Sequence, residues 1–566
     1  MEKRWKVNEV NEGLKGELAK EMGILPLTAQ LLINRGIVDS GAAYSFFSPD
    51  LNDLHDPMLM KGMERAVSRI TEALVRKEPI AVWGDYDVDG VTSAALLKIF
   101  FREIGAPLLC RIPNRLSEGY GLNIEGIKAL SGQGVKVIIT VDCGIANSEE
   151  ISFASSLGID TIVTDHHQVH NGVPPAFSVI NPLQEGCRFP FKELAGVGVA
   201  FNFIVALRAH LRETSFFKKE APNLKRYLDI VAIGTVADMV PLIDENRILV
   251  SWGLKQLNEG RRPGVGALVA LSGLTAGKVT GENIAFQLAP RINAAGRLED
   301  ASKALGVLET EDIEAARSLA RALDGGNSTR QSIEEKIFND ALAMVGDYER
   351  QKVIIAAKEG WHSGVTGIVA GRLVERFNRP AVLIAIEGAV GKGSIRGIKG
   401  CDVTEGLKGC SELLERYGGH KSAAGFTIKK IRIDEFSVAY ARFMDAAITD
   451  EDLIEELRLD CAVSFEELSG RLMTELDRLQ PFGRSNERPL FCATSADILQ
   501  SEVVGRGHLK MLIKQNGRMQ KAIAFNGAHF HPVRGRVDIA FYPYIDEWQG
   551  GRNLRLQVKD LRPSSS

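Results

Sequence analysis

Three aspartates alternate within five residues, at Asp85, Asp87 and Asp89. The apolar run at 80–83 before them predicts a buried strand, and the residues after them predict a helix. Carboxylates this close repel one another unless a cation holds them, and hard oxygen ligands suit Mg²⁺, Mn²⁺ or Ca²⁺. The spacing also matches the opening of an EF-hand loop, but that loop follows a helix and needs a glutamate at its twelfth position, where this chain has Leu96. The run therefore predicts a metal site between a strand and a helix.

Polar side chains that could bind metal also follow two later predicted strands and one apolar predicted helix. They are Asp142 after the strand at 135–141, Asp165, His166 and His167 after the strand at 159–164, and Asp238 after the helix at 227–237. In an open α/β sheet, the carboxyl ends of the strands are the usual place for a ligand site. A solvated acidic loop would explain the first run alone, and a single buried Asp or His is commonly a satisfied core group. Four such endings in one series favour a dinuclear metal site.

Asp-His-His after a strand, with Asp-x-Asp-Gly upstream, resembles the DHH phosphoesterase superfamily. Further motifs make the chain similar to the bacterial single-strand-specific DNA exonucleases within it; they lie at 113–115, 118–123, 194–200, 234–242 and 290–298. The resemblance covers the chain from about residue 25 to its end. It implies an α/β fold with a two-lobed core, in which a parallel-sheet metal lobe and a smaller α/β DHH-associated lobe are joined by helices. A C-terminal β-barrel of the OB-fold type completes the implied architecture.

The same resemblance implies a metal-dependent 5′-to-3′ exonuclease that degrades single-stranded DNA to 5′-mononucleotides in DNA repair and recombination. Two divalent cations, Mn²⁺ or Mg²⁺, would be its cofactors. The implied metal ligands are Asp85, Asp87, Asp89, Asp142, His166 and Asp238. Asp142 would bridge the ions, with Asp87 on one ion and Asp89, His166 and Asp238 on the other. Asp85 is either a ligand or a support for one.

The expected catalytic residues are Asp142 and two residues that adjoin the ligand His166, namely Asp165 and His167. Asp165 would orient its neighbours rather than bind metal, and His167 would meet the scissile phosphate as an electrophile or a proton donor. Two rival functions stay open. A DHH phosphodiesterase for short oligonucleotides or cyclic dinucleotides would lack the long C-terminal domain, and a scaffold that only binds single strands would not need the intact set of acids and histidines.

Candidate DNA-contacting residues lie outside the acidic series. They are Arg115, Arg297, Ser394, Arg396 and His420. A guanidinium grips phosphate bidentately, and an exonuclease needs a cationic pocket that stops the 5′ end of the strand just beyond the metals. Arg115 and Arg297 could equally be surface or salt-bridged arginines. Around Arg396 the similar proteins usually have Gly-Ser-Gly-Arg-Ser, whereas Ile395 and Gly397 stand here in place of the second glycine and the last serine, so the conformation of this turn is open.

The chain of 566 residues exceeds one hydrophobic core, so several domains are expected. We expect an N-terminal lead segment at 1–50, a DHH catalytic domain at 51–245, a helical connector at 246–345, a DHH-associated domain at 346–449 and an OB-fold nucleic-acid-binding domain at 450–566. The net charge is only −3, but residues 505–562 contain eleven Lys and Arg against four acids. Because nucleic acid responds to local fields, this excess of seven positive charges favours DNA binding by the last domain.

The remaining composition indicates a cytoplasmic enzyme. The N-terminus carries no apolar signal segment, no apolar run reaches the ~18 residues of a membrane helix, and the seven cysteines form no Cys-x-x-Cys pair. We expect a monomer without membrane contact whose partner is single-stranded DNA. A single-strand-binding protein and a helicase are candidate further partners.

Overall fold

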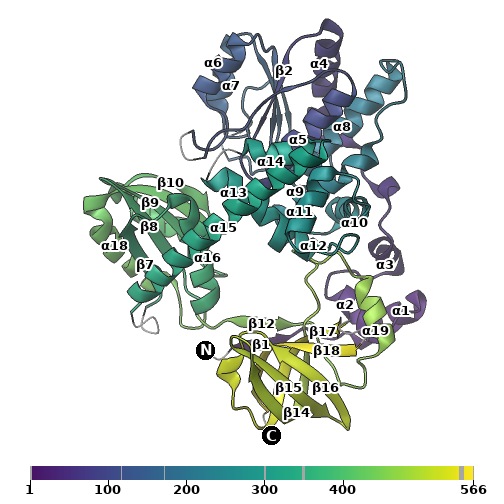
Figure 1. Cartoon of the computed structure of the whole chain (residues 1–566), viewed down its shortest axis with the longest axis vertical. Coiled ribbons are helices and arrows are strands. Elements are labelled where there is room, and N and C mark those ends of the chain that lie inside the picture. Colours follow the sequence, from purple (N-terminus) through teal and green to yellow (C-terminus); the bar gives the residue numbers. More distant parts are fainter. Residues whose placement is uncertain are drawn as a thin grey trace.

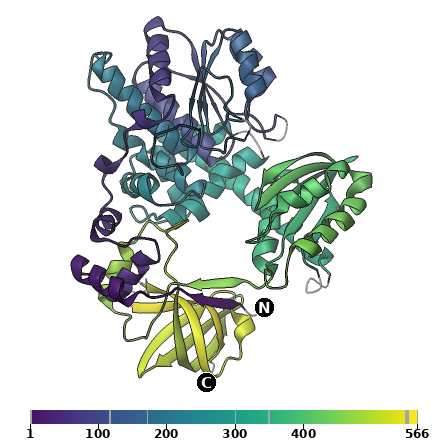
Figure 2. The same ribbon diagram turned by 180° about the vertical axis from the view of Figure 1, so that it is seen from behind.

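The computed structural model describes residues 3–115, 118–170, 172–298, 301–346, 351–546 and 553–564. Two α/β lobes, a helical connector and a C-terminal barrel together form a ring (Figures 1 and 2). The first lobe lies at the top of Figure 1, the second at its left and the barrel at its base. The α/β lobes and the barrel expected from the sequence are therefore present.

The first lobe is built on a five-stranded parallel sheet with the order β3-β2-β4-β5-β6. Its strands are β2 (Ile80–Gly84), β3 (Leu109–Arg111), β4 (Val137–Val141), β5 (Asp160–Thr164) and β6 (Ser178–Ile180). β2 and β4 are buried along their whole length, which explains their continuous apolar sequences. Because β3 lies on one side of β2 and β4 on the other, the strand order reverses between β2 and β4. Open α/β sheets bind their ligands at such a point.

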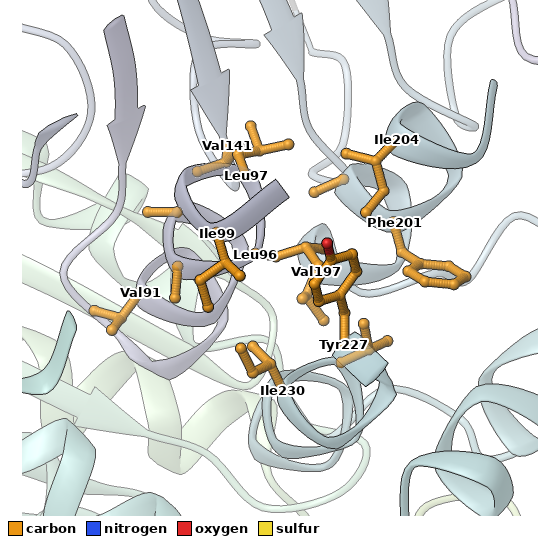
Figure 3. Close-up of a cluster of buried hydrophobic side chains, with 14 of the residues drawn as sticks. Val91, Leu96, Leu97, Ile99, Val141, Val197, Phe201, Ile204, Tyr227 and Ile230 are labelled. Atoms are coloured by element: carbon orange, nitrogen blue, oxygen red, sulfur yellow. The ribbon is translucent and has the colours of Figure 1, made fainter. Parts of the chain in front are cut away.

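Helices cover both faces of this sheet, and three of them form a buried layer. The helices are α4 (Met63–Arg76), α5 (Val88–Glu103), α6 (Ile124–Gly132), α7 (Ser148–Ser156), α8 (Gly196–Glu213), α9 (Leu228–Ala237) and α10 (Asp244–Asn258). α5, α8 and α9 pack together through Leu96, Val197 and Ile230, and Tyr227 from the turn before α9 joins them, as Figure 3 shows. Apart from Asp229 and Thr235, α9 is apolar on all sides, and such a helix is stable only when it is buried.

The connector leads from the first lobe to the second. It contains α11 (Pro263–Leu271), α12 (Gly281–Asn283), η4 (Ile284–Leu288), α13 (Ala289–Leu298), α14 (Ser302–Glu309) and α15 (Ile313–Met344). η4 is a π-helical segment that precedes Pro290, whose missing N–H cannot continue an α-helical ladder. At 1.5 Å per residue, the 32 residues of α15 reach about 48 Å, which is enough to join the lobes.

The second lobe has a mixed sheet with the order β10-β11-β9-β8-β7. Its elements are β7 (Ile354–Glu359), α16 (Ser363–Phe377), β8 (Ala381–Glu387), β9 (Val390–Arg396), α17 (Val403–Gly409), β10 (Leu414–His420), β11 (Ala423–Lys429) and α18 (Ile433–Ala447). Ile395 is fully buried in the core of this lobe. A Cβ at Gly397 would lie 2.8 Å from Cγ1 of Val403. The segment expected to be a turn is therefore the end of strand β9, and packing inside the lobe accounts for Ile395 and Gly397.

The C-terminal domain is a closed barrel. Its strands are β13 (Cys461–Ala462), β14 (Phe491–Val504), β15 (His508–Gln515), β16 (Arg518–Ala524), β17 (Gly535–Asp546) and β18 (Asn553–Pro563), with α19 (Gly470–Asp477) before β14. β14 pairs with both β15 and β17, and this second pairing closes the sheet on itself.

The N-terminal segment belongs to the barrel domain in space. It forms β1 (Arg4–Val7), α1 (Glu12–Met22), α2 (Pro26–Ile33) and α3 (Ser40–Phe47). Leu18, Leu31 and Leu32 are buried in one hydrophobic core with α19 and the barrel strands. β1 pairs in parallel with β12 (Glu456–Leu459), which lies between the second lobe and the barrel. The first and last parts of the chain therefore fold as one unit.

Short 3-10 turns complete the described elements, at Leu51–Asp53, Pro57–Leu59, Leu224–Tyr227, Ser411–Leu413, Lys430–Arg432 and Ala528–Phe530. Within the described ranges, none of the helices combines the length and the apolar composition that crossing a membrane requires.

Candidate metal centre and phosphate pocket

The alternating aspartates lie where β2 ends and α5 begins. Asp87 is the N-cap of α5, and its Oδ1 accepts hydrogen bonds from the backbone N–H groups of Asp89 (2.9 Å) and Gly90 (3.1 Å). Asp85 and Asp89 are buried on either side of this cap. A Cβ at Gly90 would lie 2.5 Å from the backbone of Asp85, so only glycine lets the loop close this tightly.

Asp89 is held by the first turn of α8. Its two carboxylate oxygens accept hydrogen bonds from the N–H groups of Gly196 (2.6 Å) and Val197 (2.8 Å). A Cβ at Gly196 would lie 2.8 Å from Cβ of Asp142, which explains a glycine at this position. A helix N-terminus attracts negative charge, so the glycine-rich motif at 194–200 anchors the acidic loop.

The Asp-His-His run follows β5 and is ordered by its own aspartate. Oδ1 of Asp165 accepts hydrogen bonds from the N–H groups of His166 (2.7 Å) and His167 (3.0 Å), and it lies 2.8 Å from Nδ1 of His167. Oδ2 accepts a further hydrogen bond from the N–H group of Ile145 (2.9 Å). Burial alone would raise the pKa of Asp165, but the hydrogen bond and the charge of His167 lower it. This carboxylate is thus fully engaged in holding the run.

The structure brings all six candidate metal ligands together. Three groups have ligand atoms within 4.8 Å of one another: Asp85, Asp87 and Asp142; Asp89, His166 and Asp238; and Asp142, His166 and His167. Nε2 of His166 lies 3.2 Å from Oδ1 of Asp142, 3.7 Å from Oδ2 of Asp238 and 3.8 Å from Oδ2 of Asp89. Asp142 lies between the other ligands, and its backbone takes a left-handed conformation with φ of 58°.

The electrostatics of this cluster fit divalent cations. Burial and mutual repulsion raise the pKa values of Asp85, Asp142 and Asp238, and they raise that of Asp89 to about 7. Burial and the charge of His167 lower the pKa of His166 to about 4. Across the described residues, Oδ1 of Asp85, Oδ1 of Asp142 and Nε2 of His166 are buried without a hydrogen-bond partner. Cations bound by these atoms would satisfy them and offset the repulsion.

His167 has the opposite electrostatic character. Burial would lower its pKa, but the hydrogen bond to Asp165 and the negative charges of Asp165 and Asp238 raise it to about 9. The hydroxyl group of Tyr120 donates to the backbone oxygen of Asp142 (3.2 Å) and lies 3.4 Å from Nδ1 of His167. His167 is therefore a partly exposed cation at the edge of an acidic cluster.

Three candidate phosphate-binding arginines from different parts of the chain come together. Arg115 follows β3 and lies over the ring of Tyr86, with Cζ 5.1 Å from the ring centroid. Burial, together with repulsion from Arg115, Arg330 and Arg396, lowers the pKa of Arg297 to about 10. Burial and the charge of Arg115 also lower the pKa of Arg396. Such a cluster of partly buried cations fits an anion such as phosphate.

The remaining second-lobe candidates lie on β9 and β10, which flank β11. Oγ of Ser394 lies 3.0 Å from Oγ1 of Thr366 on α16. A Cβ at Gly367 would lie 3.1 Å from Nη2 of Arg396, so the glycine allows the guanidinium to approach α16. Arg396 on β9 and His420 on β10 both face Ala423 of β11 in the sheet register, which places their backbones about 10 Å apart. The ring of His420 meets that of His170 from the first lobe, with centroids 6.2 Å apart.

Several residues of this region were not expected from the sequence. They are Tyr120 beside His167, Asn293 beside the acidic loop, Arg330 beside Arg297 and Arg484, whose charge lowers the pKa of Asp238. The signal for Tyr120 and Asn293 was their position inside the motifs at 118–123 and 290–298, whereas Arg484 lies outside those motifs. Arg330 lies on α15 outside any motif, so only the fold reveals it.

The barrel presents basic residues on its surface. Lys510 and Lys514 on β15 and Lys521 on β16 are exposed beside Met519, while the alternate residues of β15 are buried. Phe525, which follows β16, is 56% exposed. These three lysines are thus available to a polyanion.

Comparisons with known proteins agree with this architecture. Residues 79–235 match the DHH family, N-terminal domain; residues 350–446 match the DHHA1 domain; and residues 459–560 match the RecJ OB domain. The single-stranded-DNA-specific exonuclease RecJ of Bacillus subtilis is 37% identical, over 99% of this chain and 71% of that protein. RecJ of Escherichia coli is 36% identical, over 89% of this chain and 91% of that protein.

A solved structure extends the similarity to three dimensions. The crystal structure of RecJ in complex with Mn²⁺ from Thermus thermophilus superposes with a TM-score of 0.87 at 30% identity, covering 100% of this chain and 80% of that one. A second structure of the Thermus protein, in complex with Mg²⁺, gives a TM-score of 0.81. The sequence identity, the shared domains and this superposition show that the chain belongs to the RecJ family of DHH phosphoesterases.

Proposed function

We propose that this protein is a metal-dependent exonuclease that degrades single-stranded DNA from the 5′ end and releases 5′-mononucleotides. The observation that carries the proposal is the pairing of two sites: a buried cluster of acids and histidines, and an arginine cluster beside it. The first suits phosphodiester hydrolysis and the second suits a terminal phosphate. The relatives named as single-stranded-DNA-specific exonucleases support the choice of substrate.

Two divalent cations, Mn²⁺ or Mg²⁺, are the proposed cofactors. One would be held by Asp85, Asp87 and Asp142, and the other by Asp89, His166 and Asp238, with Asp142 shared between them. Two of the three groups of neighbouring ligand atoms support this division, and Asp85 belongs to the first of them. When divalent ions are bound in such a site, the attacking water loses its proton more easily and the charge on the phosphate is neutralised.

Asp165 and His167 are proposed to act together on the substrate side. Nδ1 of His167 is engaged by Asp165, so its Nε2 nitrogen is the one left to face the scissile phosphate. A cationic imidazole there would donate a hydrogen bond to a phosphate oxygen or a proton to the leaving oxygen. Asp165 would fix the orientation of this ring without binding metal.

The 5′ polarity is proposed to arise from the arginine cluster. Arg115, Arg297 and Arg396, with Ser394 beside the last, would bind the terminal 5′-phosphate, and His420 would contact the strand where the two lobes meet. A pocket of this kind would stop the strand at a fixed distance from the metal ligands, so that one nucleotide is released at a time.

The barrel would bind the rest of the strand through its exposed lysines, as OB-folds bind single strands by charge and stacking. In this proposal, residues 51–245 carry out catalysis and residues 246–345 connect the two lobes. Residues 346–449 bind the 5′ end, and residues 450–566 bind the strand.

The setting of this activity is inferred from the resemblance alone. We propose a monomeric cytoplasmic enzyme of DNA repair and recombination that works beside a single-strand-binding protein and a helicase.

Digestion of an end-labelled single strand tests the proposal. A 5′-label should appear as mononucleotide from the start with Mn²⁺ or Mg²⁺, a 3′-label should stay on shortening strands, and EDTA should stop both. Cleavage of dinucleotides but not of long strands would favour the rival small-substrate phosphodiesterase. Binding without cleavage under every metal condition would favour the scaffold.

A further inference from the structure

Helix α13 of the connector caps the loop that carries the acids after β2. Oδ1 of Asn293 accepts a hydrogen bond of 3.2 Å from the backbone N–H of Val88. Val88 is the first residue of α5 and lies between Asp87 and Asp89. The next two N–H groups of α5 donate to Asp87 instead. Since the first N–H groups of a helix need partners from outside it, Asn293 completes the cap that Asp87 begins.

One turn further on, the backbone of α13 meets the same loop. A Cβ at Gly296 would lie 2.2 Å from the carbonyl oxygen of Tyr86 and 3.4 Å from its Cβ. Gly296 lies within the helix, so space rather than backbone conformation requires a glycine here. Any larger residue must push α13 away from the loop, and Gly296 therefore sets the separation between them.

The last turn of α13 faces the second lobe. Nη1 of Arg297 donates a hydrogen bond of 3.2 Å to the backbone oxygen of Gly364, which lies at the start of α16. A Cβ at Gly364 would lie 2.9 Å from the carbonyl oxygen of Arg297, so the two backbones also meet closely. α13 thus touches the acidic loop through Asn293 and Gly296, and the second lobe through Arg297.

We propose that Asn293 and Gly296 are positioning residues that lock α13 to the acidic loop, so that the helix carrying the end-binding Arg297 also fixes Asp87 and Asp89. The identity of the end ligand rests on the proposed function, whereas the effect on the metal ligands does not. A shift of the second lobe or of Arg297 would then reach the metal ligands through one rigid helix. End binding and metal binding would be linked rather than independent.

Four variants of the whole chain test this inference. Asn293→Ala removes the acceptor for Val88, Asn293→Asp keeps an oxygen in the same place, and Gly296→Ala forces α13 away from Tyr86. Gly325→Ala is the matched control, because Gly325 lies in α15 and a Cβ there meets nothing within 4 Å. The first measurement is the Mn²⁺ dissociation constant without DNA, from the electron paramagnetic resonance signal of free Mn²⁺. The second is the ratio of kcat/KM for 5′-phosphorylated and 5′-hydroxyl strands.

Asn293→Ala should weaken Mn²⁺ binding by about 10-fold or more, as is typical when a support of a metal ligand is lost, and Asn293→Asp should restore most of it. Gly296→Ala should reduce both Mn²⁺ affinity and the preference for a 5′-phosphate, while Gly325→Ala should change neither. Wild-type Mn²⁺ affinity in Asn293→Ala, or equal losses in the Ala and Asp variants, would overturn the positioning role. If Gly296→Ala does not fold, the two Asn293 variants still decide this role.

A different result would refute the coupling of end binding to metal binding through α13. Weak Mn²⁺ binding in Gly296→Ala with a full preference for 5′-phosphate would show that α13 does not join the two sites. A wild-type protein that binds Mn²⁺ but leaves single strands intact would refute the proposed function and not the positioning role, because the Mn²⁺ titrations contain no DNA.

Discussion

The carboxylate of Asp165 separates the roles of two adjacent histidines. It receives hydrogen bonds from both of their backbone N–H groups, but only the His167 ring reaches it, at 2.8 Å. The His166 ring turns the other way, toward Asp142, Asp89 and Asp238. One imidazole therefore faces the acids as a neutral donor of a nitrogen lone pair, and its neighbour is held as a cation.

Asp142→Ala should abolish cleavage while strand binding persists, because this residue lies between both proposed ion positions. We expect kcat to fall by roughly 1000-fold, which corresponds to about 4 kcal/mol of lost transition-state stabilisation. Asp445→Ala, an exposed acid on α18, serves as the control. Release of labelled mononucleotide and a filter-binding assay measure the two effects, and a wild-type rate in Asp142→Ala would refute the shared-ligand role.

His167→Ala should lower kcat by roughly 100-fold, within the usual range for acid–base groups, and leave Mn²⁺ occupancy near normal. The reason is that His167 is assigned to the phosphate and not to an ion. Metal analysis of the purified protein and steady-state kinetics measure the two quantities, with His210→Ala on α8 as the control. Loss of Mn²⁺ from His167→Ala would mean that the roles of the two histidines are reversed.

Arg396→Ala should reduce the preference for 5′-phosphorylated strands by about 10- to 100-fold, since hydrogen bonds to a charged group contribute about 1.5–3 kcal/mol. Overall strand affinity should change less, because the barrel binds elsewhere. Arg416→Ala is a matched control, an exposed arginine on β10 of the same sheet. Competition between the two strand types measures the preference, and an unchanged ratio would remove Arg396 from the pocket.

Among the elements, the close approach of α9 to α5 positions the second group of ligands. A Cβ at Gly234 on α9 would lie 2.2 Å from Oγ1 of Thr92, 2.8 Å from Cγ1 of Val197 and 3.2 Å from Oδ1 of Asp89. Asp238 is the C-cap of the same helix. Gly234 thus sets the distance between Asp89 and Asp238, although it is adjacent to neither of them in the sequence.

Gly234→Ala should lower the free energy of unfolding by about 1–3 kcal/mol through overpacking and should weaken Mn²⁺ binding, because α9 moves away from α5. Gly326→Ala should instead leave Mn²⁺ binding unchanged and stabilise α15 slightly, since a Cβ there meets nothing within 4 Å. Calorimetry of both metal-free proteins and Mn²⁺ titration measure the contrast. Equal stability and equal Mn²⁺ affinity in the two variants would show that the packing of α9 does not position the metal ligands.

Sequence patterns predicted those parts of the site that depend on short-range order. Continuous apolar strands followed by acids placed Asp85, Asp142 and Asp165 at one sheet edge, because parallel strands present the same end to the same side. Contacts across large separations were beyond such reasoning. Val88 and Asn293 are 205 residues apart, and no periodicity in either segment indicates the other. The role of Leu18 and Leu31 was likewise hidden, since their partners are more than 400 residues away.

At the scale of the whole molecule, two connections attach the barrel unit to the lobes. On one side, Arg247 of α10 donates to the backbone oxygens of Phe46 (2.9 Å), Leu479 (3.1 Å) and Gln480 (2.8 Å). On the other side, β12 carries the chain from the second lobe into the barrel and is paired with β1. Trp5 of β1 donates a hydrogen bond of 2.7 Å to Asp560 of β18. The N-terminal segment therefore supports the junction of second lobe and barrel.

A fragment without the barrel should be a folded monomer only when the N-terminal helices are removed as well. A fragment spanning 51–448 should stay monomeric, bind Mn²⁺ and hold long strands more weakly. Its salt dependence should flatten by about 0.7 log units per tenfold change in salt for each lost phosphate contact. A fragment spanning 1–448 should self-associate, because the apolar sides of α1 and α2 lose their partner. Light scattering and salt titrations of strand binding compare the fragments, and an unchanged salt slope would remove the barrel as a DNA platform.

The shared core of α2 and α19 also has a consequence for biosynthesis. Leu31 leaves the ribosome more than 400 residues before Leu472 and Leu476, with which it shares a core. At the usual 5–20 residues per second, this interval lasts roughly 20–90 s. Throughout it the leucines of the nascent N-terminus lack the part of their native core that α19 and the barrel strands supply. We expect the newly made chain to depend on a holding chaperone during that interval, and to aggregate when translation stalls before residue 470.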